Sequence, residues 1–358
     1  MKRITARGAG KDNGESAGNR HPDLNSGGSG DGPETGTSSA TGPGSGALFG
    51  SAADSGPPVI SAEDLGKRYR QKWALKGCDL VIPGGHVVGL VGPNGAGKTT
   101  LLHLAVGLLS PTAGSIEVLG RRPAIDPAQL AKVGFVAQDT PVYSRMSVAD
   151  HLKFGASMNP GWDAEVAQRR IAELDLDPDQ RAGSLSGGQR AQLALTLAIA
   201  KRPELLILDE PVAALDPLAR REFLQSLMEI MAEGGVSVVM SSHLVADLER
   251  VCDHIVVLVS SRVQVAGDVE ALLARHHRLT GPRHDQRSLP SDWQVVEESH
   301  TDRQSTLLVC TESPILDPSW AVEDVGLEDL VLAYMGQAST TKRRKTAAAA
   351  TPRLGAVQ

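Results

Sequence analysis

The order of apolar and polar positions separates the strands of this chain from its helices. Residues 86–92, HVVGLVG, form a short run of branched apolar side chains, which predicts a buried strand. Residues 101–109, LLHLAVGLL, form a longer apolar stretch that predicts a helix. The stretch that begins near Val59 alternates like strands, and strand and helix signals then follow one another as far as about Arg275. This order predicts an α/β domain with a largely parallel sheet.

The same pattern divides the chain into regions. We predict one α/β domain over residues 58–275, with a mainly helical insert at about 139–183. Residues 276–290 are polar and contain Pro and Gly, which predicts a linker. Residues 291–336 contain two strand-like runs, WQVVEE and STLLVC, and a final helix, GLEDLVLAYM. We therefore expect a small α+β accessory region there.

Both ends of the chain lack core-forming residues. Residues 1–57 are rich in Gly, Ser, Ala and Asn, and such a segment cannot bury enough apolar surface to offset its ordering entropy. We predict that it is disordered, and a misassigned translation start is the alternative explanation. Residues 337–358 carry a basic cluster at 342–345 followed by polyalanine, and we predict a solvated, disordered tail. Contact of the basic cluster with anionic lipid or nucleic acid is the alternative.

Composition limits the classes of function. The 358 residues are 41% hydrophobic, with a net charge of −6, so nucleic acid is not expected as the main partner. Cys78, Cys252 and Cys310 lie far apart in no metal-ligand spacing, which favours reduced thiols over a disulfide or a zinc site. No apolar run approaches the roughly 18 to 20 residues that span a bilayer. The basic N-terminal segment lacks an apolar stretch, so we do not expect it to act as a secretory signal. We expect a soluble, cytoplasmic protein that reaches a membrane only through a partner.

A glycine-rich loop follows the strand at 86–92. The segment GPNGAGKTT fits the pattern G-x-x-x-x-G-K-[ST] and lies between a predicted strand and a predicted helix, which is the context of a P-loop. Backbone N–H groups and the helix N-terminus bind phosphates there, Lys98 supplies a positive charge, and the Thr99 hydroxyl is placed to ligate Mg²⁺. The predicted nucleotide-binding residues are Gly92, Pro93, Asn94, Gly95, Ala96, Gly97, Lys98, Thr99 and Thr100.

Two carboxylates end a second apolar strand. The segment LLILDEP, residues 205–211, has the arrangement of a Walker B motif. We predict that Asp209 holds Mg²⁺ and that Glu210 activates the attacking water as general base. An Asp-Glu pair alone is more often a pair of solvated charges, but the upstream P-loop favours the catalytic interpretation.

The segment LSGGQ, at 185–189, resembles the signature of the ABC ATPase family. It precedes the predicted helix RAQLALTLAIA and lies some twenty residues before the Walker B motif. The resemblance implies that these residues bind the γ-phosphate held by the opposite protomer. The residues that match are Ser186, Gly187, Gly188 and Gln189.

Four single residues match other motifs of that family. Gln138 resembles the Q-loop glutamine, which implies a role at the metal ion and the water and a link to the membrane partner. Asp216 resembles the D-loop aspartate, and His243 resembles the switch histidine that contacts the γ-phosphate. Tyr69 resembles the aromatic residue that stacks on adenine, although Trp73 lies close by. The implied catalytic set is Glu210, His243 and Gln138, and the implied metal set is Thr99, Gln138 and Asp209.

The resemblance covers about 59–275 and implies a fold, cofactors and partners. The implied fold is a P-loop, RecA-like core with a mostly parallel sheet, an antiparallel β subdomain and a helical subdomain that carries the signature. ATP and Mg²⁺ are the implied cofactors. A second ATPase subunit, identical or similar, and a separate transmembrane permease are the implied partners. The segment GLEDLVLAYMG resembles the tail of drug-exporter-type ATPases, so export is expected.

Three other classes of function compete with transport. ATPases of this family that act on ribosomes usually carry two tandem domains, whereas this chain holds one set of motifs. Family members that repair or organise DNA have a long coiled coil or zinc modules between the P-loop and the signature. The stretch between Lys98 and Ser186 holds neither a heptad run nor a zinc pattern. A catalytically inactive binder requires damaged motifs, and these are intact.

Overall fold

The computed structural model describes residues 48–49, 56–283 and 289–337. Most of the two segments predicted to be disordered, and the basic cluster at 342–345, therefore lie outside the described residues. One part of the first segment differs from the prediction. Leu48 and Phe49 form strand β1, which pairs in parallel with Val265 and Ala266. They are the only adjacent large apolar residues in the first 57.

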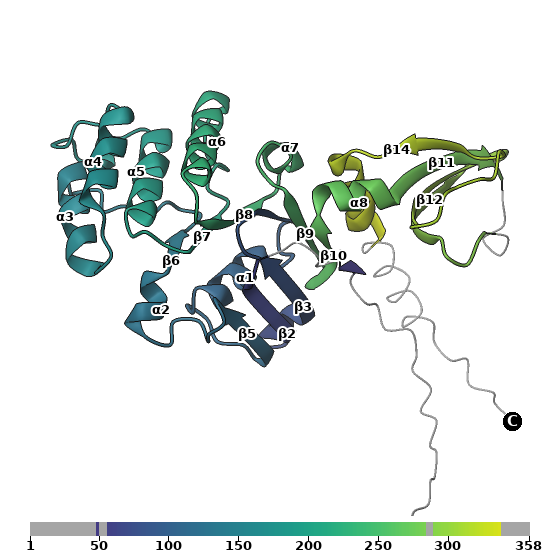
Figure 1. Ribbon diagram of the computed structural model, residues 1–358, viewed down its shortest axis with the longest axis horizontal. Coiled ribbons are helices and arrows are strands. Elements are labelled where there is room, and N and C mark those ends of the chain that lie inside the picture. Colours follow the sequence, from purple (N-terminus) through teal and green to yellow (C-terminus); the bar gives the residue numbers. More distant parts are fainter. Residues whose placement is uncertain (1–47, 50–55, 284–288, 338–358) are drawn as a thin grey trace, which may run out of the picture. The chain divides into compact units, whose positions relative to one another are not determined.

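A seven-stranded sheet forms the centre of the ATPase-like region (Figure 1). Its order is β1-β10-β9-β4-β8-β7-β6, and every neighbouring pair is parallel except β9 and β10. This confirms the predicted parallel α/β core. The remaining strands are β4 (Val87–Val91), β6 (Val133–Val136), β7 (Leu205–Asp209), β8 (Ser237–Ser242), β9 (His254–Val259) and β10 (Arg262–Asp268).

The central strands are buried on both faces, and their alternate side chains enter two separate cores. In β7, Leu206 and Leu208 join one core, while Leu205 and Ile207 join the other. This follows from the two-residue period of a strand and explains the unbroken apolar runs in the sequence. The first core is covered by α5 (Gly187–Ile199), α6 (Pro217–Ala232) and α7 (Val245–Leu248). The second is covered by α1 (Lys98–Ala105) and an antiparallel sheet.

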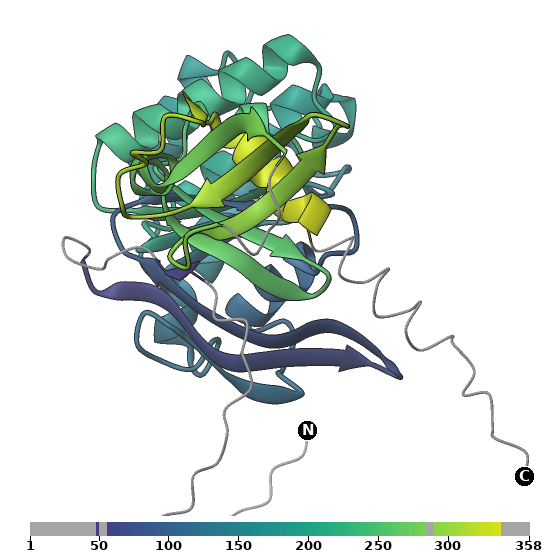
Figure 2. The same cartoon turned by 90° about the vertical axis from the view of Figure 1, so that its right-hand side faces the viewer.

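The antiparallel sheet has the order β3-β2-β5. Its strands are β2 (Pro58–Tyr69), β3 (Lys72–Pro83) and β5 (Ala113–Val118). The long hairpin of β2 and β3, the darkest strands, is clear in Figure 2. The antiparallel β subdomain implied by the family resemblance is therefore present.

The predicted insert at 139–183 is helical. It contains α3 (Val148–Met158), α4 (Ala164–Glu173) and the short 3₁₀ helix η1 (Ala182–Ser184), and a short α2 (Pro127–Ala131) precedes it. The helices α3, α4 and η1 share a small core with α5, formed by Val148, Ile171, Leu176, Ala182, Leu185 and Leu193. Because α5 contributes to this core and to that of the sheet, it joins the insert to the ATPase core.

The predicted linker at 276–290 is wrong in its first part. After α8 (Val269–Arg275), residues His276–Pro282 form strand β11, which pairs with β13 and β14. The four-stranded sheet has the order β12-β13-β11-β14, with β12 (Gln294–His300), β13 (Gln304–Cys310) and β14 (Ala321–Asp324). The polar composition of residues 276–290 predicted a linker, but His276 and Leu279 are fully buried. Cross-strand pairing, which single-sequence patterns do not show, determines this strand.

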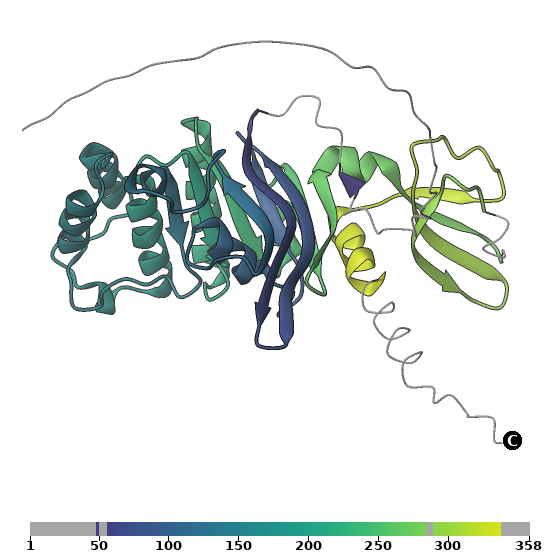
Figure 3. The same ribbon diagram turned by 90° about the horizontal axis from the view of Figure 1, so that it is seen from below.

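A helix over 327–337 follows this sheet, as the sequence predicted. It is the yellow helix beside α8 in Figure 3. Leu327, Leu330 and Val331 share a core with Leu272 of α8. The ring of His276 fixes the junction, because its Nδ1 lies 2.6 Å from the Leu272 carbonyl oxygen and its Nε2 lies 2.9 Å from the Tyr334 hydroxyl. Nδ1–H therefore donates to the carbonyl, and Nε2 accepts from the hydroxyl.

We predict that this junction makes stability depend on pH. Burial lowers the pKa of His276 from its ordinary value of 6.5, so the unfolded chain binds this proton more readily than the folded chain. The contribution of the neutral ring is fully present above pH 6.5 and is lost as the pH falls toward the lowered value. We expect His276→Gln to reduce the fall in melting temperature between neutral and mildly acidic pH, where each kcal/mol corresponds to about 2–4 °C.

Calorimetry at several pH values measures the melting temperature of His276→Gln. His103→Gln, in the partly buried helix α1, is the control. An unchanged pH dependence in His276→Gln would contradict the assignment.

Candidate active site

The P-loop turns from the end of β4 into the start of α1. Gly97 caps α1 with a φ of 115°, and a Cβ at this position would lie 2.5 Å from the Ala74 carbonyl oxygen. A Cβ on Gly92 would collide with the Leu258 carbonyl oxygen of β9. Only glycine fits both positions, and so the loop can bring its backbone N–H groups to one concave surface.

Lys98 is the first residue of α1, and its side chain is almost completely buried. Its Nζ donates to the Gly92 carbonyl oxygen at 2.8 Å and lies 3.2 Å from Oε1 of Glu210. The side chains of Lys98 and Glu210 are only 5% and 11% exposed. The predicted phosphate-binding lysine and the predicted general base are therefore direct neighbours.

Glu210 has a second partner from the next strand. Its Oε2 lies 3.2 Å from Nδ1 of His243, which follows β8. Glu210 has a φ of +46°, in the left-handed region that side chains seldom adopt. The structure thus joins the predicted base to the predicted switch histidine.

Asp209 is buried and has one free oxygen. Its Oδ1 accepts a hydrogen bond of 2.7 Å from the Ser241 hydroxyl, and the same hydroxyl accepts from the Glu210 N–H at 2.8 Å. Among the described residues, Oδ2 of Asp209 has no hydrogen-bond partner. A buried carboxylate oxygen without a partner is costly, and a hard divalent cation prefers such a ligand. The residue therefore fits its predicted role toward Mg²⁺.

One hollow of about 500 Å³ brings most of the predicted site together. It is lined by Tyr69, Trp73, Gln138, Glu210 and His243 together with the loop from Pro93 to Thr100. Tyr69 is 47% exposed, and Nζ of Lys67 lies 5.6 Å from the centre of its ring. Both aromatic residues lie in this hollow, so adenine stacking by Tyr69 stays a prediction.

The signature residues lie apart from that hollow. Ser186 caps α5, with a bond of 3.1 Å from the Gln189 N–H to its hydroxyl and one of 2.9 Å from its own N–H to the Gln189 side chain. Ser186, Gly188 and Gln189 line a different hollow, of about 730 Å³, between helices of the insert and α6. Asp216 caps α6 and accepts from the N–H groups of Leu218 and Ala219. Within one chain, Ser186, Gly188 and Gln189 therefore do not share a hollow with the P-loop.

Comparison with known proteins identifies the family. The family model for ABC transporters matches residues 75–213. An uncharacterized ABC transporter ATP-binding protein of Bacillus subtilis, YxlF, is 35% identical over 220 residues, which are 60% of this chain and 72% of that protein. The chain belongs to the ABC transporter ATP-binding proteins. It is thus an ATP-binding subunit of the ABC ATPase type, as its motifs predicted.

Other family members are similar to different extents. The thiamine import ATP-binding protein ThiQ of Vibrio parahaemolyticus is 33% identical, over 61% of this chain and 94% of its own length. The chain spans 63% of the molybdenum import ATP-binding protein ModC of Aromatoleum aromaticum, which is also 33% identical. A solved ATP-binding subunit of an ABC transporter superposes with a TM-score of 0.55 and 28% identity, over 60% of this chain and 92% of that one.

Ser241 is a residue of this ABC ATPase site that our sequence motifs missed. It pairs with Asp209 in the parallel register of β7 and β8. In the sequence it is one of two serines before His243, and only the strand order shows that its hydroxyl reaches both carboxylate residues. The two serines at the end of the apolar run in β8 were the available signal.

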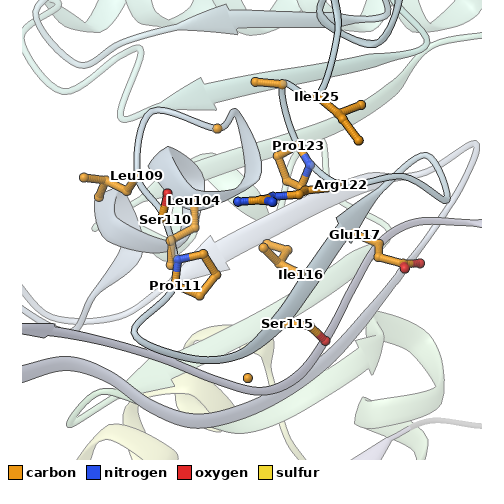
Figure 4. A pocket seen from close by; sticks show the side chains of 13 residues that line it. Leu104, Leu109, Ser110, Pro111, Ser115, Ile116, Glu117, Arg122, Pro123 and Ile125 are labelled. Atoms are coloured by element: carbon orange, nitrogen blue, oxygen red, sulfur yellow. The ribbon is translucent and has the colours of Figure 1, made fainter.

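A further hollow of about 670 Å³ lies between the end of α1 and β5 (Figure 4). Leu104, Ile116 and Ile125 line it, and the Arg122 side chain projects across it. None of the predicted nucleotide-site residues line it, so it is separate from the site of ATP chemistry.

Proposed function

We propose that this chain hydrolyses ATP to drive transport through a separate membrane permease, which holds it at the cytoplasmic face of the membrane. The observation that supports this most is the single hollow that contains the P-loop, Gln138, Glu210 and His243. None of the helices in the described ranges, 48–49, 56–283 and 289–337, is both long and apolar enough to cross a bilayer. In the proposal, the membrane path therefore belongs to the partner.

The site supplies each function that phosphoryl transfer to water requires. Backbone N–H groups of the P-loop and the positive end of α1 bind the phosphates, and Lys98 neutralises charge at the γ-phosphate. Glu210 accepts the proton of the attacking water, and His243 orients the Glu210 carboxylate through its contact at Oε2. Thr99, Gln138 and Asp209 would hold Mg²⁺, which supplies positive charge to the phosphate oxygens. The buried, unpartnered Oδ2 of Asp209 supports that assignment.

We predict that two substitutions separate binding from hydrolysis. Lys98→Ala should weaken ATP binding, because the phosphates lose a buried cationic partner. Glu210→Gln should retain ATP binding and lower the hydrolysis rate by about a hundredfold or more, since it removes the proton acceptor. Nucleotide titration and phosphate release measure the two effects. Glu204→Gln is the matched control, because Glu204 is exposed and pairs with Lys132 one residue before β7. Hydrolysis by Glu210→Gln at the normal rate would rule out the general-base role.

We further infer that ATP is held between two ATPase subunits. In this chain the signature and the P-loop line different hollows, although both begin helices whose N-termini can bind phosphate. A second copy, or a similar subunit, can bring its Ser186 to the exposed side of the γ-phosphate. In this arrangement Asp216 lies close to the same interface, since its helix α6 shares the hollow with the signature.

Mixed dimers test this arrangement in a Glu210→Gln background. In one dimer, Lys98→Ala is on one chain and Ser186→Arg is on the other, and a shared site predicts one intact ATP pocket. In a second dimer, both changes are on the same chain, and a shared site predicts none. ATP occlusion by differently tagged, purified dimers is the measurement. The reversed result, with occlusion only in the second dimer, would show that each site lies within one chain.

We propose that the permease contacts an exposed apolar patch of the helical insert. The patch consists of Tyr143, Phe154 and Met158, which are 60%, 44% and 65% exposed. The rings of Tyr143 and Phe154 meet edge to face at 5.9 Å, so the first two form one surface. Met146 and Trp162, which the sequence also marks as apolar residues of the insert, are less exposed. The patch follows Gln138 in the chain, and Gln138 lines the nucleotide hollow. A movement of Gln138 on nucleotide binding can therefore reach a partner bound at the patch.

We predict that charge on this patch uncouples transport from hydrolysis. Tyr143→Glu, Phe154→Glu and Met158→Glu should each lower transport and co-purification of the permease several-fold, because a carboxylate must be desolvated at the interface. Basal ATPase activity of the isolated subunit should stay unchanged. Leu316→Glu is the control, since Leu316 is 83% exposed and lies outside the insert. Full transport by all three folded variants would exclude this surface as the docking site.

Export was expected from the resemblance of residues 326–336 to drug-exporter tails. ThiQ and ModC are named as import proteins, and they do not support that expectation.

A further inference from the structure

A cluster of two histidines and an aspartate lies away from the active site. His86 precedes β4, Asp253 precedes β9, and His254 is the first residue of β9. One ligand-type atom from each of the three lies within 4.8 Å of the others. β4 and β9 are parallel neighbours, so the cluster lies at their amino ends. The P-loop leaves the opposite end of β4, which at five residues is roughly 17 Å long.

The carboxylate of Asp253 lies between the two rings. Nδ1 of His86 is 3.0 Å from Oδ2 of Asp253, and Nδ1 of His254 is 3.4 Å from Oδ1. The two rings are tilted against each other, with centroids 4.3 Å apart. A tetrahedral zinc ion with bonds of about 2.0–2.1 Å spaces its ligand atoms by about 3.3 Å. One donor atom from each of the three residues lies within 4.8 Å of the others, so a small inward shift of the side chains brings them to the spacing that one ion requires.

One of these donors has no hydrogen bond. Nδ1 of His254 is buried and, within the described part of the chain, makes no hydrogen bond despite its closeness to Asp253. A buried ring nitrogen without a partner is uncommon, because it has lost its hydration without compensation. Nδ1 of His254 lies beside the Asp253 carboxylate and the His86 ring. A cation bound by all three side chains would supply its missing partner. The cluster therefore holds a hydrogen-bonded pair, His86 and Asp253, together with a third, buried donor that has only an ion-pair contact of 3.4 Å.

The backbone holds the cluster in place. Oδ1 of Asp253 accepts from the Val87 N–H at 3.0 Å, and the Asp253 N–H donates to the Val87 carbonyl oxygen at 3.1 Å. His254 pairs with Val88 in the parallel register of β9 and β4. The three residues are thus attached to two buried strands before any ion binds. Such preorganisation lowers the entropy cost of assembling a metal site.

The chemistry of the donors selects the ion. A carboxylate and two neutral imidazoles suit zinc and other first-row transition metals, whereas Mg²⁺ and Ca²⁺ prefer oxygen alone. Cys252 does not belong to the cluster, because its sulfur packs toward Gly89. The Asp253 side chain is half exposed, so water can complete the coordination.

We propose that His86, Asp253 and His254 bind a divalent transition-metal ion, Zn²⁺ first among them, that clamps the starts of β4 and β9. The ion would link the two strands that carry the P-loop and pack against it. This site is distinct from the proposed Mg²⁺ site at Asp209, which lies at the carboxyl end of β7. The proposal does not depend on ATP hydrolysis or on a permease.

The test uses the full chain, without a histidine tag and stripped of metal by a chelator. Zn²⁺ titration against a chelating indicator should show one tight equivalent, and Co²⁺ should give a visible absorption band at the same stoichiometry. His86→Gln and His254→Gln should each weaken Zn²⁺ at least tenfold, and the double variant should lose the tight equivalent. Zn²⁺ should raise the melting temperature of the unaltered chain and not that of the double variant.

Two further variants keep the result interpretable. Asp253→Asn retains an oxygen that can accept from the Val87 N–H, so it removes a ligand charge with little change to the fold. His300→Gln is the matched control, because His300 lies 3.8 Å from Glu298 in a histidine–carboxylate pair without a second imidazole. ATP binding and the melting temperature in chelator confirm that each variant is folded. Tight Zn²⁺ binding that survives in the folded double variant, or its absence from the unaltered chain, would overturn the proposal.

Discussion

The active site depends on one constraint, which is that the parallel strands β4, β7 and β8 end at the same edge of a buried sheet. Val91 pairs with Ser242, and Asp209 pairs with Ser241, so three chain segments leave the sheet side by side. The segments supply the P-loop, the Asp209–Glu210 pair and His243. Every residue of these strands is buried, and a slip of one residue would exchange their two apolar faces. Hydrophobic packing on both faces therefore fixes the positions of the charged groups.

The contact between Lys98 and Glu210 orients the two side chains in the active site and contributes little to the stability of the fold. Removing two charges from water costs nearly as much as their attraction returns, so a buried ion pair adds little to the free energy of folding. Its two members nevertheless come from different segments, because Lys98 begins α1 after β4 and Glu210 follows β7, and their side chains meet at 3.2 Å. His243 contacts the other oxygen of Glu210 at the same distance. The carboxylate is thus oriented from two sides before a substrate binds, which is the preorganisation that catalysis requires.

How much the sequence predicts depends on whether a feature is local. The P-loop and the Walker B segment are predictable because a short apolar strand and a few adjacent residues define each of them. Strand β11 is not, because His276 and Leu279 look like linker residues until β13 and β14 pair with them. The same limit applies to Ser241, whose role appears only when β7 and β8 are placed side by side. The cluster of His86, Asp253 and His254 joins residues far apart in the chain, and no spacing rule could detect it.

Backbone strain at Glu210 links the end of β7 to the active site. In an extended strand, Asp209 and Glu210 would point to opposite faces of the sheet. A φ of +46° at Glu210 ends that alternation at a cost of about 1–3 kcal/mol. The Ser241 hydroxyl opposes this cost by accepting from the strained N–H while it donates to Asp209. One side chain on β8 therefore fixes both the oxygen of Asp209 that is engaged and the direction in which Glu210 turns toward Lys98.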